Sequence, residues 1–226
     1  MAKVYLSPST QDWNLYAGGL GNEEQWMRDI AIHAAAILRE AGHTVKVGGL
    51  ISAGLNATDA NNWGAQYYVA IHTNAGGGVG TEAWYYTGST LGRKLATSVY
   101  NRVAKVSSCA DRGVKSSTSY IELNRPKAPS TIIELDFHDR LANAKEIIAR
   151  HEQYAYAIAA GVTDLIGGTM PDPVPPKPEG ATPVWRFRNK KTGCHFYTAS
   201  EAEKNIVQKD IENWTYEGVA FYAVEV

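Results

Sequence analysis

The chain has 226 residues, of which 44% are hydrophobic and 20% are charged, and its formal net charge is -1. This length accommodates one domain of about 150 to 170 residues and a second, small one. The near-neutral charge offers no attraction to nucleic acid or anionic membranes, so we expect neither nucleic-acid binding nor membrane insertion. The two cysteines, Cys109 and Cys194, lack metal-type spacing, which predicts neither a disulfide framework nor a cysteine zinc site.

The first part of the chain predicts strands that alternate with helices. Residues 3–6 form a short strand in this prediction, and Asn22 is a good N-cap for a helix over about residues 23–41, whose first turn is acidic. Residues 43–47 predict a second strand. Residues 55–64 predict a loop or a short helix.

The strongest strand signal is the apolar run from Tyr67 to Ala75, which three glycines follow. A continuous apolar run of this kind suits a parallel strand that is covered on both faces. It places His72 near the carboxyl end of the strand, where ligands bind in open α/β sheets. A hydrogen-bonded structural histidine is the alternative interpretation.

The second part of the first domain continues the alternation of strands and helices. The pattern predicts, in order, a strand, a helix, two short segments, a second buried strand and a long amphipathic helix, at residues 82–86, 89–106, 112–115, 120–123, 130–137 and 141–166. Like the first buried strand, the second ends in polar groups. The alternation predicts an α/β fold with a mostly parallel, twisted sheet flanked by helices.

Proline content predicts a domain boundary. Residues 169–183 hold six of the nine prolines, which is typical of an extended spacer. We therefore expect a first domain at residues 1–168 and a small α+β module at residues 184–226. The module is rich in aromatic residues, with short strands around a helix at residues 200–209, and is very small for an independent core.

Several motifs in residues 3–166 occur in the order found in one family. They are the loop after the first strand, the Glu-led helix with Asp29-Ile30-Ala31, the Ile-His-x-Asn-Ala strand, Arg112-Gly113-Val114-Lys115, and the strand from Pro129 to Phe137. This region resembles the Amidase_3 family of zinc-dependent N-acetylmuramoyl-L-alanine amidases. The resemblance implies a peptidoglycan hydrolase that cleaves the amide between N-acetylmuramic acid and the L-alanine of the stem peptide.

The resemblance also implies the roles of individual residues. Glu23 and His72 match zinc ligands, and Glu134 matches the catalytic carboxylate. Zinc with three protein ligands keeps a fourth position for water and lowers the pKa of that water. Glu134 would take the proton and pass it to the departing amine. Asn74 and Arg125 are candidates for substrate binding, although Arg125 also suits a solvated surface charge.

One family ligand is missing from this sequence. The family has a histidine in an Asp-Pro-Gly-His-Gly loop, whereas Thr10 occupies that place here, in Ser7-Pro8-Ser9-Thr10-Gln11. His138, four residues after Glu134, is the expected substitute, and Gln11 is the second choice. A weakly bound metal, an inactive site, or a helix-capping role for His138 are the alternatives.

Other polar residues suggest competing assignments. His33, His43 and His151 lie on elements away from the predicted site, and we expect none of them to bind the metal. Glu134 and Asp136 share one strand face, as a carboxylate pair for glycoside cleavage would. With the family motifs present, we expect Asp136 to orient a ligand or the loop after Glu134.

The module at residues 184–226 resembles one copy of an aromatic-rich repeat that occurs in tandem in extracellular and cell-wall-associated proteins. Its rings suit binding of wall carbohydrate, or they fill a small core. Because repeat units pack on neighbouring copies, we expect a homo-oligomer through this module, with a ring of three preferred.

The whole chain resembles a bacteriophage endolysin. No leader precedes the first strand, so we expect synthesis in the cytoplasm and action on the cell wall after release. The rival hypothesis is a non-catalytic wall-binding protein on a degenerate amidase fold.

Overall fold

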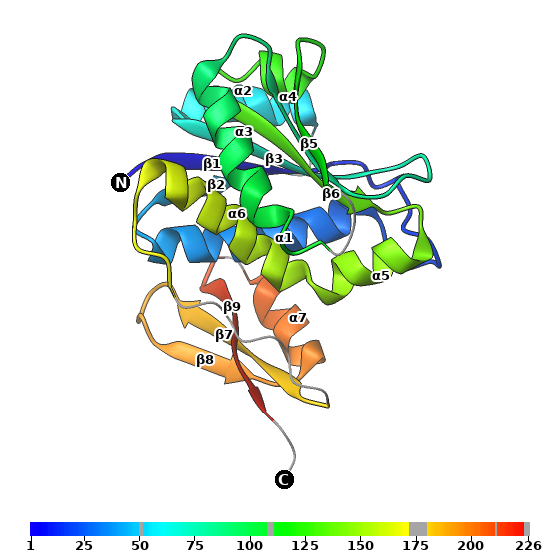
Figure 1. Cartoon of the computed structure of the whole chain (residues 1–226). Coiled ribbons are helices and arrows are strands. Elements are labelled where there is room, and N and C mark those ends of the chain that lie inside the picture. The colour runs from blue at the N-terminus through cyan, green and yellow to red at the C-terminus, as the bar shows by residue number, and fades with distance from the viewer. Residues whose placement is uncertain (50–51, 108–110, 172–179, 211, 224–226) are drawn as a thin grey trace. The chain divides into compact units, whose positions relative to one another are not determined.

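The computed structural model divides the chain into two compact units, Met1–Pro171 and Asp172–Val226 (Figure 1). The residues that the structure describes are 1–49, 52–107, 111–171, 180–210 and 212–223. Most of the expected spacer at residues 169–183 lies outside the described residues, and so does Cys109.

A six-stranded sheet forms the centre of the first unit. Its strands in chain order are β1 (Lys3–Pro8), β2 (Thr44–Val47), β3 (Tyr67–Asn74), β4 (Thr81–Tyr86), β5 (Asp111–Ser117) and β6 (Ser130–Phe137). The spatial order is β2-β1-β3-β6-β4-β5. All neighbouring pairs are parallel except β4 and β6, which are antiparallel. The predicted mostly parallel sheet is therefore confirmed.

Helices cover both faces of this sheet. They are α1 (Glu23–Glu40), α2 (Ala53–Trp63), α3 (Thr90–Val103), α4 (Ile121–Asn124), α5 (Leu141–Ala149) and α6 (His151–Ile166). The larger core joins α1, α3 and α6 to strand residues such as Val4 and Leu6, whereas the smaller core joins α2 to Tyr5. This alternation along β1 is expected for a strand buried on both sides. Within the described ranges, the protein has no helix that is both long and apolar enough to span a membrane.

The start of α1 is set by the cap that the sequence predicts. The side chain of Asn22 accepts a hydrogen bond from the backbone N–H of Gln25, at 2.8 Å. The first helical residue is Glu23, whose side chain is completely buried at the positive end of the helix. The cap therefore fixes the position of a buried carboxylate.

The prediction of one helix over residues 141–166 is wrong at one point. The chain leaves helical geometry at Arg150, with φ -112° and ψ 16°, so that α5 ends and α6 begins. The Arg150 side chain pairs with Glu146 and donates to the carbonyl oxygen of Val106. Because α5 contacts β6 while α6 packs on α1 and α3, tertiary packing overrides a continuous periodicity.

The second unit is a small antiparallel sheet with one helix. Its elements are β7 (Thr182–Asn189), β8 (His195–Thr198), α7 (Glu201–Lys209) and β9 (Trp214–Ala223), and the strand order is β8-β7-β9. Phe187 is completely buried, with the rings of Phe196 and Tyr216 centred 6.3 and 5.0 Å away. The predicted helix and α+β composition are confirmed, and at least these rings form a core.

Candidate active site

The two predicted site strands lie side by side at the centre of the sheet. His72 of β3 is directly paired with Glu134 of β6, and Glu134 is in turn opposite Glu82 of β4. Because β3 and β6 are parallel, their carboxyl ends meet at one edge. The structure thus brings together the histidine and the carboxylate that the sequence singles out.

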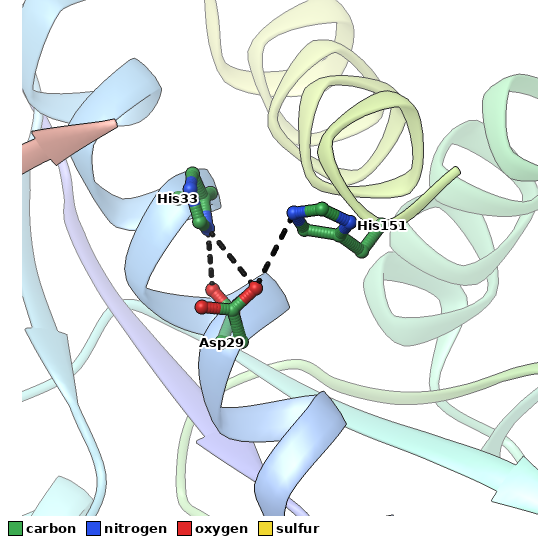
Figure 2. A group of neighbouring side chains, drawn as sticks. All are labelled: Asp29, His33 and His151. Atoms are coloured by element: carbon green, nitrogen blue, oxygen red, sulfur yellow. Dashed lines mark hydrogen bonds and ion pairs between the residues drawn. The ribbon is translucent and has the colours of Figure 1, made fainter. Parts of the chain in front are cut away.

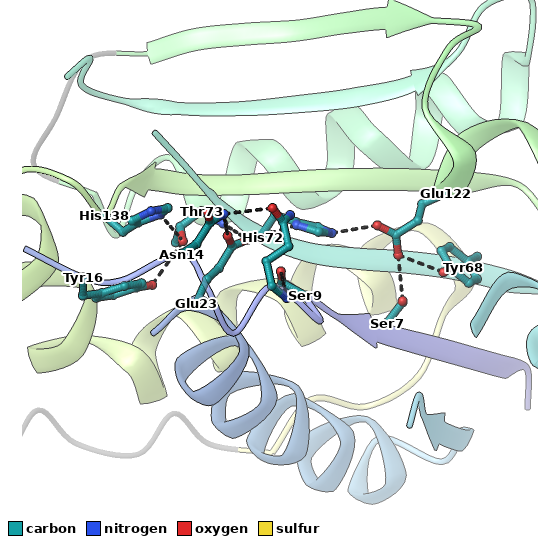
Figure 3. Close-up of polar contacts among 11 residues, drawn as sticks. Ser7, Ser9, Asn14, Tyr16, Glu23, Tyr68, His72, Thr73, Glu122 and His138 are labelled. Atoms are coloured by element: carbon teal, nitrogen blue, oxygen red, sulfur yellow. Dashed lines mark hydrogen bonds and ion pairs between the residues drawn. The ribbon is translucent and has the colours of Figure 1, made fainter. Parts of the chain in front are cut away.

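The imidazole of His72 lies between two buried carboxylates (Figure 3). Its Nδ1 is 3.0 Å from Glu23 Oε1, and its Nε2 is 2.7 Å from Glu122 Oε2. Glu23 Oε1 also accepts the backbone N–H of Thr73, and Glu23 Oε2 accepts a hydrogen bond from Asn14. Both ring nitrogens of His72 are therefore occupied by anionic partners.

Sequence reasoning missed Glu122. It lies in the short helix α4, within the segment at residues 120–123. Its Oε1 accepts hydrogen bonds from the hydroxyls of Ser7 and Tyr68, at 2.7 and 2.9 Å. The one available signal was an acidic residue in a short segment of undefined structure. That signal does not predict that Glu122 of α4 contacts Ser7 of β1 and Tyr68 of β3.

The three groups change one another's protonation. Burial disfavours an imidazolium, but Glu122 and Glu23 outweigh it and raise the pKa of His72 well above its usual value. Burial likewise opposes ionisation of the two carboxyls, but His72 holds the pKa of Glu23 and of Glu122 below the usual range. Without a metal, Glu23, His72 and Glu122 form an ion-paired triad. A metal ion that binds a ring nitrogen of His72 would have to displace the proton from that nitrogen.

Glu134 has a different environment. Among the described residues, its buried Oε2 has no hydrogen-bond partner. Burial raises the pKa of Glu134 to about 7; His72 opposes this shift, while Glu23, Glu82 and Glu122 add to it. A carboxyl group that titrates near neutrality is suited to act as a general base and then as a general acid.

A pocket of about 380 Å³ opens onto these groups. Its lining comes from the loop after β1, the start of α2, and strands and helices around the site: Pro8, Ser9, Thr10, Gln11, Trp13, Ser52, Ala53, His72, Tyr120, Ile121, Glu122, Ile132 and Glu134. Trp13 and Tyr120 are exposed large side chains. The pocket thus joins a polar centre to exposed aromatic surface.

His138 is not brought to the predicted metal ligands. Its ring stacks on Tyr16, with centroids 5.2 Å apart and planes at 5°, and its Nδ1 is 3.0 Å from Thr73 Oγ1 (Figure 3). In the described part of the chain, Glu23, His72 and His138 do not form a group whose ligand atoms lie within 4.8 Å of one another. His138 as a metal ligand stays a prediction.

Gln11, the second choice, lies closer to the site. It lines the pocket, and its Oε1 accepts a hydrogen bond of 2.9 Å from Asn14 Nδ2, which also donates to Glu23 at 2.7 Å. One side chain therefore links Gln11 to the expected metal ligand. Because Gln11 lines the pocket and His138 does not, we expect Gln11 rather than His138 to supplement Glu23 and His72.

We accordingly expect Gln11→Ala to weaken zinc binding more than His138→Ala does, which reverses the order that the sequence predicts. Removing Gln11 changes the pocket next to Glu23, whereas removing His138 changes the packing on Tyr16 and Thr73. Zinc affinity of the two variants, measured by competition with a chromogenic chelator, decides between them. A much larger loss in His138→Ala would restore His138 as the third ligand.

The Arg112-to-Lys115 motif and Asn74 converge on Glu82. Glu82 accepts hydrogen bonds from Arg112, Lys115 and Asn74, at 2.7, 2.6 and 3.0 Å. Burial alone would raise the pKa of Glu82, but Lys115 and Arg112 lower it to about 2. Arg125 is exposed and donates to the carbonyl oxygen of Gly54. Neither Asn74 nor Arg125 lines the pocket, so their substrate contacts stay predictions.

Asp136 does not form a catalytic pair with Glu134. It is buried, and its Oδ1 accepts hydrogen bonds from the N–H groups of Gly80 and Phe137 and from Asn143. These bonds connect Asp136 to the segments that follow β3 and β6, and all three are made to Oδ1. The glycosidase interpretation therefore has no support from the geometry.

A second polar group lies elsewhere in the first unit, on α1 and at the start of α6 (Figure 2). Asp29 Oδ2 is 3.6 Å from His33 Nδ1 and 3.5 Å from His151 Nε2. In the described ranges, these three side chains are the group whose possible ligand atoms all lie within 4.8 Å of one another. None of them lines the pocket at Glu134. The sequence did not predict this group, whose signal was an acid and a histidine four residues apart on one helix.

Residues 14–164 match the family model of Amidase_3, N-acetylmuramoyl-L-alanine amidase. Because this match covers more than half of the chain, the chain belongs to the Amidase_3 family. The match begins at residue 14, beyond the loop that holds Thr10, so the expected replacement of a ligand histidine by Thr10 stays a prediction. Residues 167–226 match DUF5648, a domain of unknown function, so the aromatic-rich repeat that we expected here is not confirmed.

Two curated relatives are amidases of bacilli. The sporulation-specific N-acetylmuramoyl-L-alanine amidase of Bacillus subtilis (strain 168) is 27% identical over 157 residues, which are 65% of this chain and 60% of that protein. N-acetylmuramoyl-L-alanine amidase CwlM of Bacillus licheniformis is 28% identical over 173 residues, 71% of this chain and 66% of that protein. The chain thus spans about two thirds or less of the length of these relatives.

Solved structures confirm the fold of the first unit. The catalytic domain of the amidase CwlV from Bacillus (Paenibacillus) polymyxa var. colistinus has a TM-score of 0.65 at 19% identity, covering 75% of this chain and all of that one. The catalytic domain of the CD27L endolysin, which targets Clostridia difficile, has a TM-score of 0.63 at 25% identity, covering 73% and 98%.

Proposed function

We propose that this protein is a peptidoglycan hydrolase that cleaves the amide between N-acetylmuramic acid and L-alanine, with zinc as its cofactor. The observation that carries the proposal is the juxtaposition of Glu23, His72 and Glu134 at one sheet edge of an Amidase_3 fold. The pocket of about 380 Å³ gives a substrate access to His72 and Glu134.

The residues present fit a zinc ion. Carboxylate oxygen and imidazole nitrogen are both common zinc ligands, with bonds of about 2.0–2.2 Å. Two such bonds at a tetrahedral angle hold their ligand atoms about 3.4 Å apart, and Glu23 Oε1 and His72 Nδ1 are separated by 3.0 Å. When bound, zinc supplies Lewis acidity, which activates water and polarises the amide carbonyl.

Glu134 provides the proton transfers of the proposed reaction. Its carboxylate borders the pocket, and its unpartnered oxygen is free to accept a proton from water. As the oxygen of that water bonds to the carbonyl carbon, the same group donates the proton to the nitrogen of L-alanine. The amide C–N bond then breaks, leaving a carboxylic acid on the lactyl group and L-alanine as a neutral amine. In the protein without a metal, burial raises the pKa of Glu134 to about 7, which favours a carboxyl group that can accept a proton and return it near neutral pH.

The pocket walls suit a glycopeptide. Trp13 and Tyr120 expose rings on which a sugar face can stack, while Gln11 and Ser52 offer hydrogen bonds. Arg125 contacts Gly54, next to the pocket residue Ala53, so it remains our candidate for a stem-peptide carboxylate.

Digestion of purified peptidoglycan tests the proposed function. An amidase creates new N-terminal alanine amines, a glycosidase creates new reducing sugar ends, and a wall-binding protein on a degenerate amidase fold creates neither. We expect alanine amines alone. New reducing ends without amines, or no products at all, would contradict the proposal.

For the second unit we propose binding of wall carbohydrate. Support comes from the aromatic content of β7, β8 and β9, of which Tyr197 is exposed while Phe187 fills the core. With this unit the chain resembles an endolysin: an enzyme made in the cytoplasm that reaches the wall after release, as in phage lysis.

We further propose that the second unit assembles the protein into a homo-oligomer, since its 55 residues fall in the size range where cores are marginal. Light scattering of the full chain beside a chain ending at Gly168 is the measurement. The expected result is an oligomeric full chain and a monomeric truncation; two monomers would rule out this assembly.

A further inference from the structure

We propose that Glu122 is a positioning residue for zinc: it holds His72 with the proton on Nε2, so that the Nδ1 lone pair points to the ion beside Glu23. This inference rests on the proposed zinc site and concerns a residue outside the matched ligand motifs. Glu122 is 5% exposed and contacts His72 directly. A buried carboxylate next to a ligand histidine needs a physical account.

Glu122 and Glu23 cannot both bind an ion that is held by one ring nitrogen of His72. Glu23 is bonded to Nδ1 and Glu122 to Nε2, on opposite sides of the ring (Figure 3). Consistent with this, in the described part of the chain Glu23, His72 and Glu122 do not offer three ligand atoms, one from each residue, that all lie within 4.8 Å of one another. An ion at Nδ1 therefore leaves Glu122 with the other nitrogen.

The surroundings of Glu122 fix which nitrogen carries the proton. Its Oε1 is held by two hydroxyl donors, Ser7 and Tyr68, and its Oε2 is directed at His72 Nε2 at 2.7 Å. An ionised carboxylate accepts hydrogen bonds and donates none, so Nε2 must carry hydrogen. A neutral imidazole has one N–H and one lone pair, and the lone pair is then on Nδ1, next to Glu23.

This arrangement accomplishes two things for a metal site. The carboxylate fixes the plane and the tautomer of the imidazole, and its negative charge makes Nδ1 a stronger electron-pair donor. In known metal sites, loss of such an outer partner weakens metal binding by about 10- to 100-fold. The effect would matter more if Thr10 occupies the place of a ligand histidine, as we expect from the sequence.

The test is the zinc affinity of the full chain, measured by competition of Zn²⁺ with a chromogenic chelator. Glu122→Gln keeps the side-chain size and removes the charge, and we expect about 10- to 100-fold weaker binding with unchanged stoichiometry. Tyr68→Phe is the matched control, because it removes a hydrogen bond to the same carboxylate without touching His72. We expect its affinity to stay within about threefold of wild type, below the range for a lost outer partner.

A second measurement needs no variant. In a long-range ¹H–¹⁵N correlation spectrum of the zinc-loaded wild-type protein, the nitrogen shifts of His72 distinguish its tautomers. We expect Nε2 to be protonated and Nδ1 to be bound to zinc. The opposite assignment would overturn the inference even if Glu122→Gln failed to fold.

The outcomes separate this inference from the proposed function. If wild type binds zinc and Glu122→Gln binds it equally well, the positioning role is wrong and the zinc amidase stands. If Tyr68→Phe, which keeps the charge that faces Nε2, weakens binding as much as Glu122→Gln, the loss does not depend on that charge, and the positioning role is wrong again. If wild type binds no zinc, both proposals fail and His72 is the centre of a structural ion-paired triad.

Discussion

Replacing Glu134 by glutamine is expected to lower the rate of amide hydrolysis by at least about 100-fold, with zinc still bound. Glutamine has the size of glutamate but cannot take a proton from water or return one to the leaving amine. The release of alanine amines from peptidoglycan gives the rate, and metal analysis of the same sample gives the zinc content. Undiminished hydrolysis in this variant would remove Glu134 from the mechanism.

The same variant should be more stable than wild type at alkaline pH once zinc is removed. The folded-state pKa of Glu134, about 7, lies above the ordinary 4.5, so the folded protein binds this proton more tightly than the unfolded chain does. That stabilisation is complete below about pH 4.5 and is lost as pH rises through about 7, an effect of up to about 3 kcal/mol. Glu134→Gln does not undergo this loss.

Urea unfolding of chelator-treated protein at pH 4 and pH 8 measures the effect. We expect the unfolding free energy of wild type to fall relative to the variant between the two values. A constant difference would show that Glu134 titrates normally in the folded protein and is not held in an unfavourable environment.

Loss of either predicted ligand should nearly abolish zinc binding. Glu23→Ala removes the oxygen that lies 3.0 Å from His72 Nδ1, and His72→Ala removes the nitrogen itself. Each variant keeps only one of the two predicted protein ligands. Its loss of zinc affinity should therefore exceed the roughly 10- to 100-fold loss that follows removal of a group hydrogen-bonded to a ligand. Metal content of the purified variants, with circular dichroism to confirm the fold, is the measurement.

The group of Asp29, His33 and His151 supplies the matched control. A His33→Ala/His151→Ala variant should keep its zinc and its hydrolytic activity, because neither residue lines the pocket. If this variant loses the zinc while Glu23→Ala and His72→Ala keep it, the metal belongs to the group on α1 and α6, and our assignment is wrong.

The site residues that the sequence predicts are those whose position depends on local signals. An apolar run ended by glycines places His72 at a strand end, and an N-cap places Glu23 at a helix start. Glu122 escaped notice because its role depends on how a four-residue helix packs against β1 and β3, which no periodicity encodes. The environment of His138, on Tyr16 and Thr73, is likewise a product of tertiary packing.

The partners of His72 are far away along the chain: Glu23 is 49 residues before it, and Glu122 is 50 residues after it. A fragment that contains two of the three residues cannot close the triad, so the site forms only when the first unit has folded nearly as a whole. Contacts between such distant segments form slowly, because long loops must close first. A metal ion that binds there would distinguish complete from partial folding and would stabilise only the complete form, by about 2.7 kcal/mol at a free concentration 100 times its dissociation constant. Metal supply would then set how much of the chain is completely folded, independently of the part that we propose for the metal in hydrolysis.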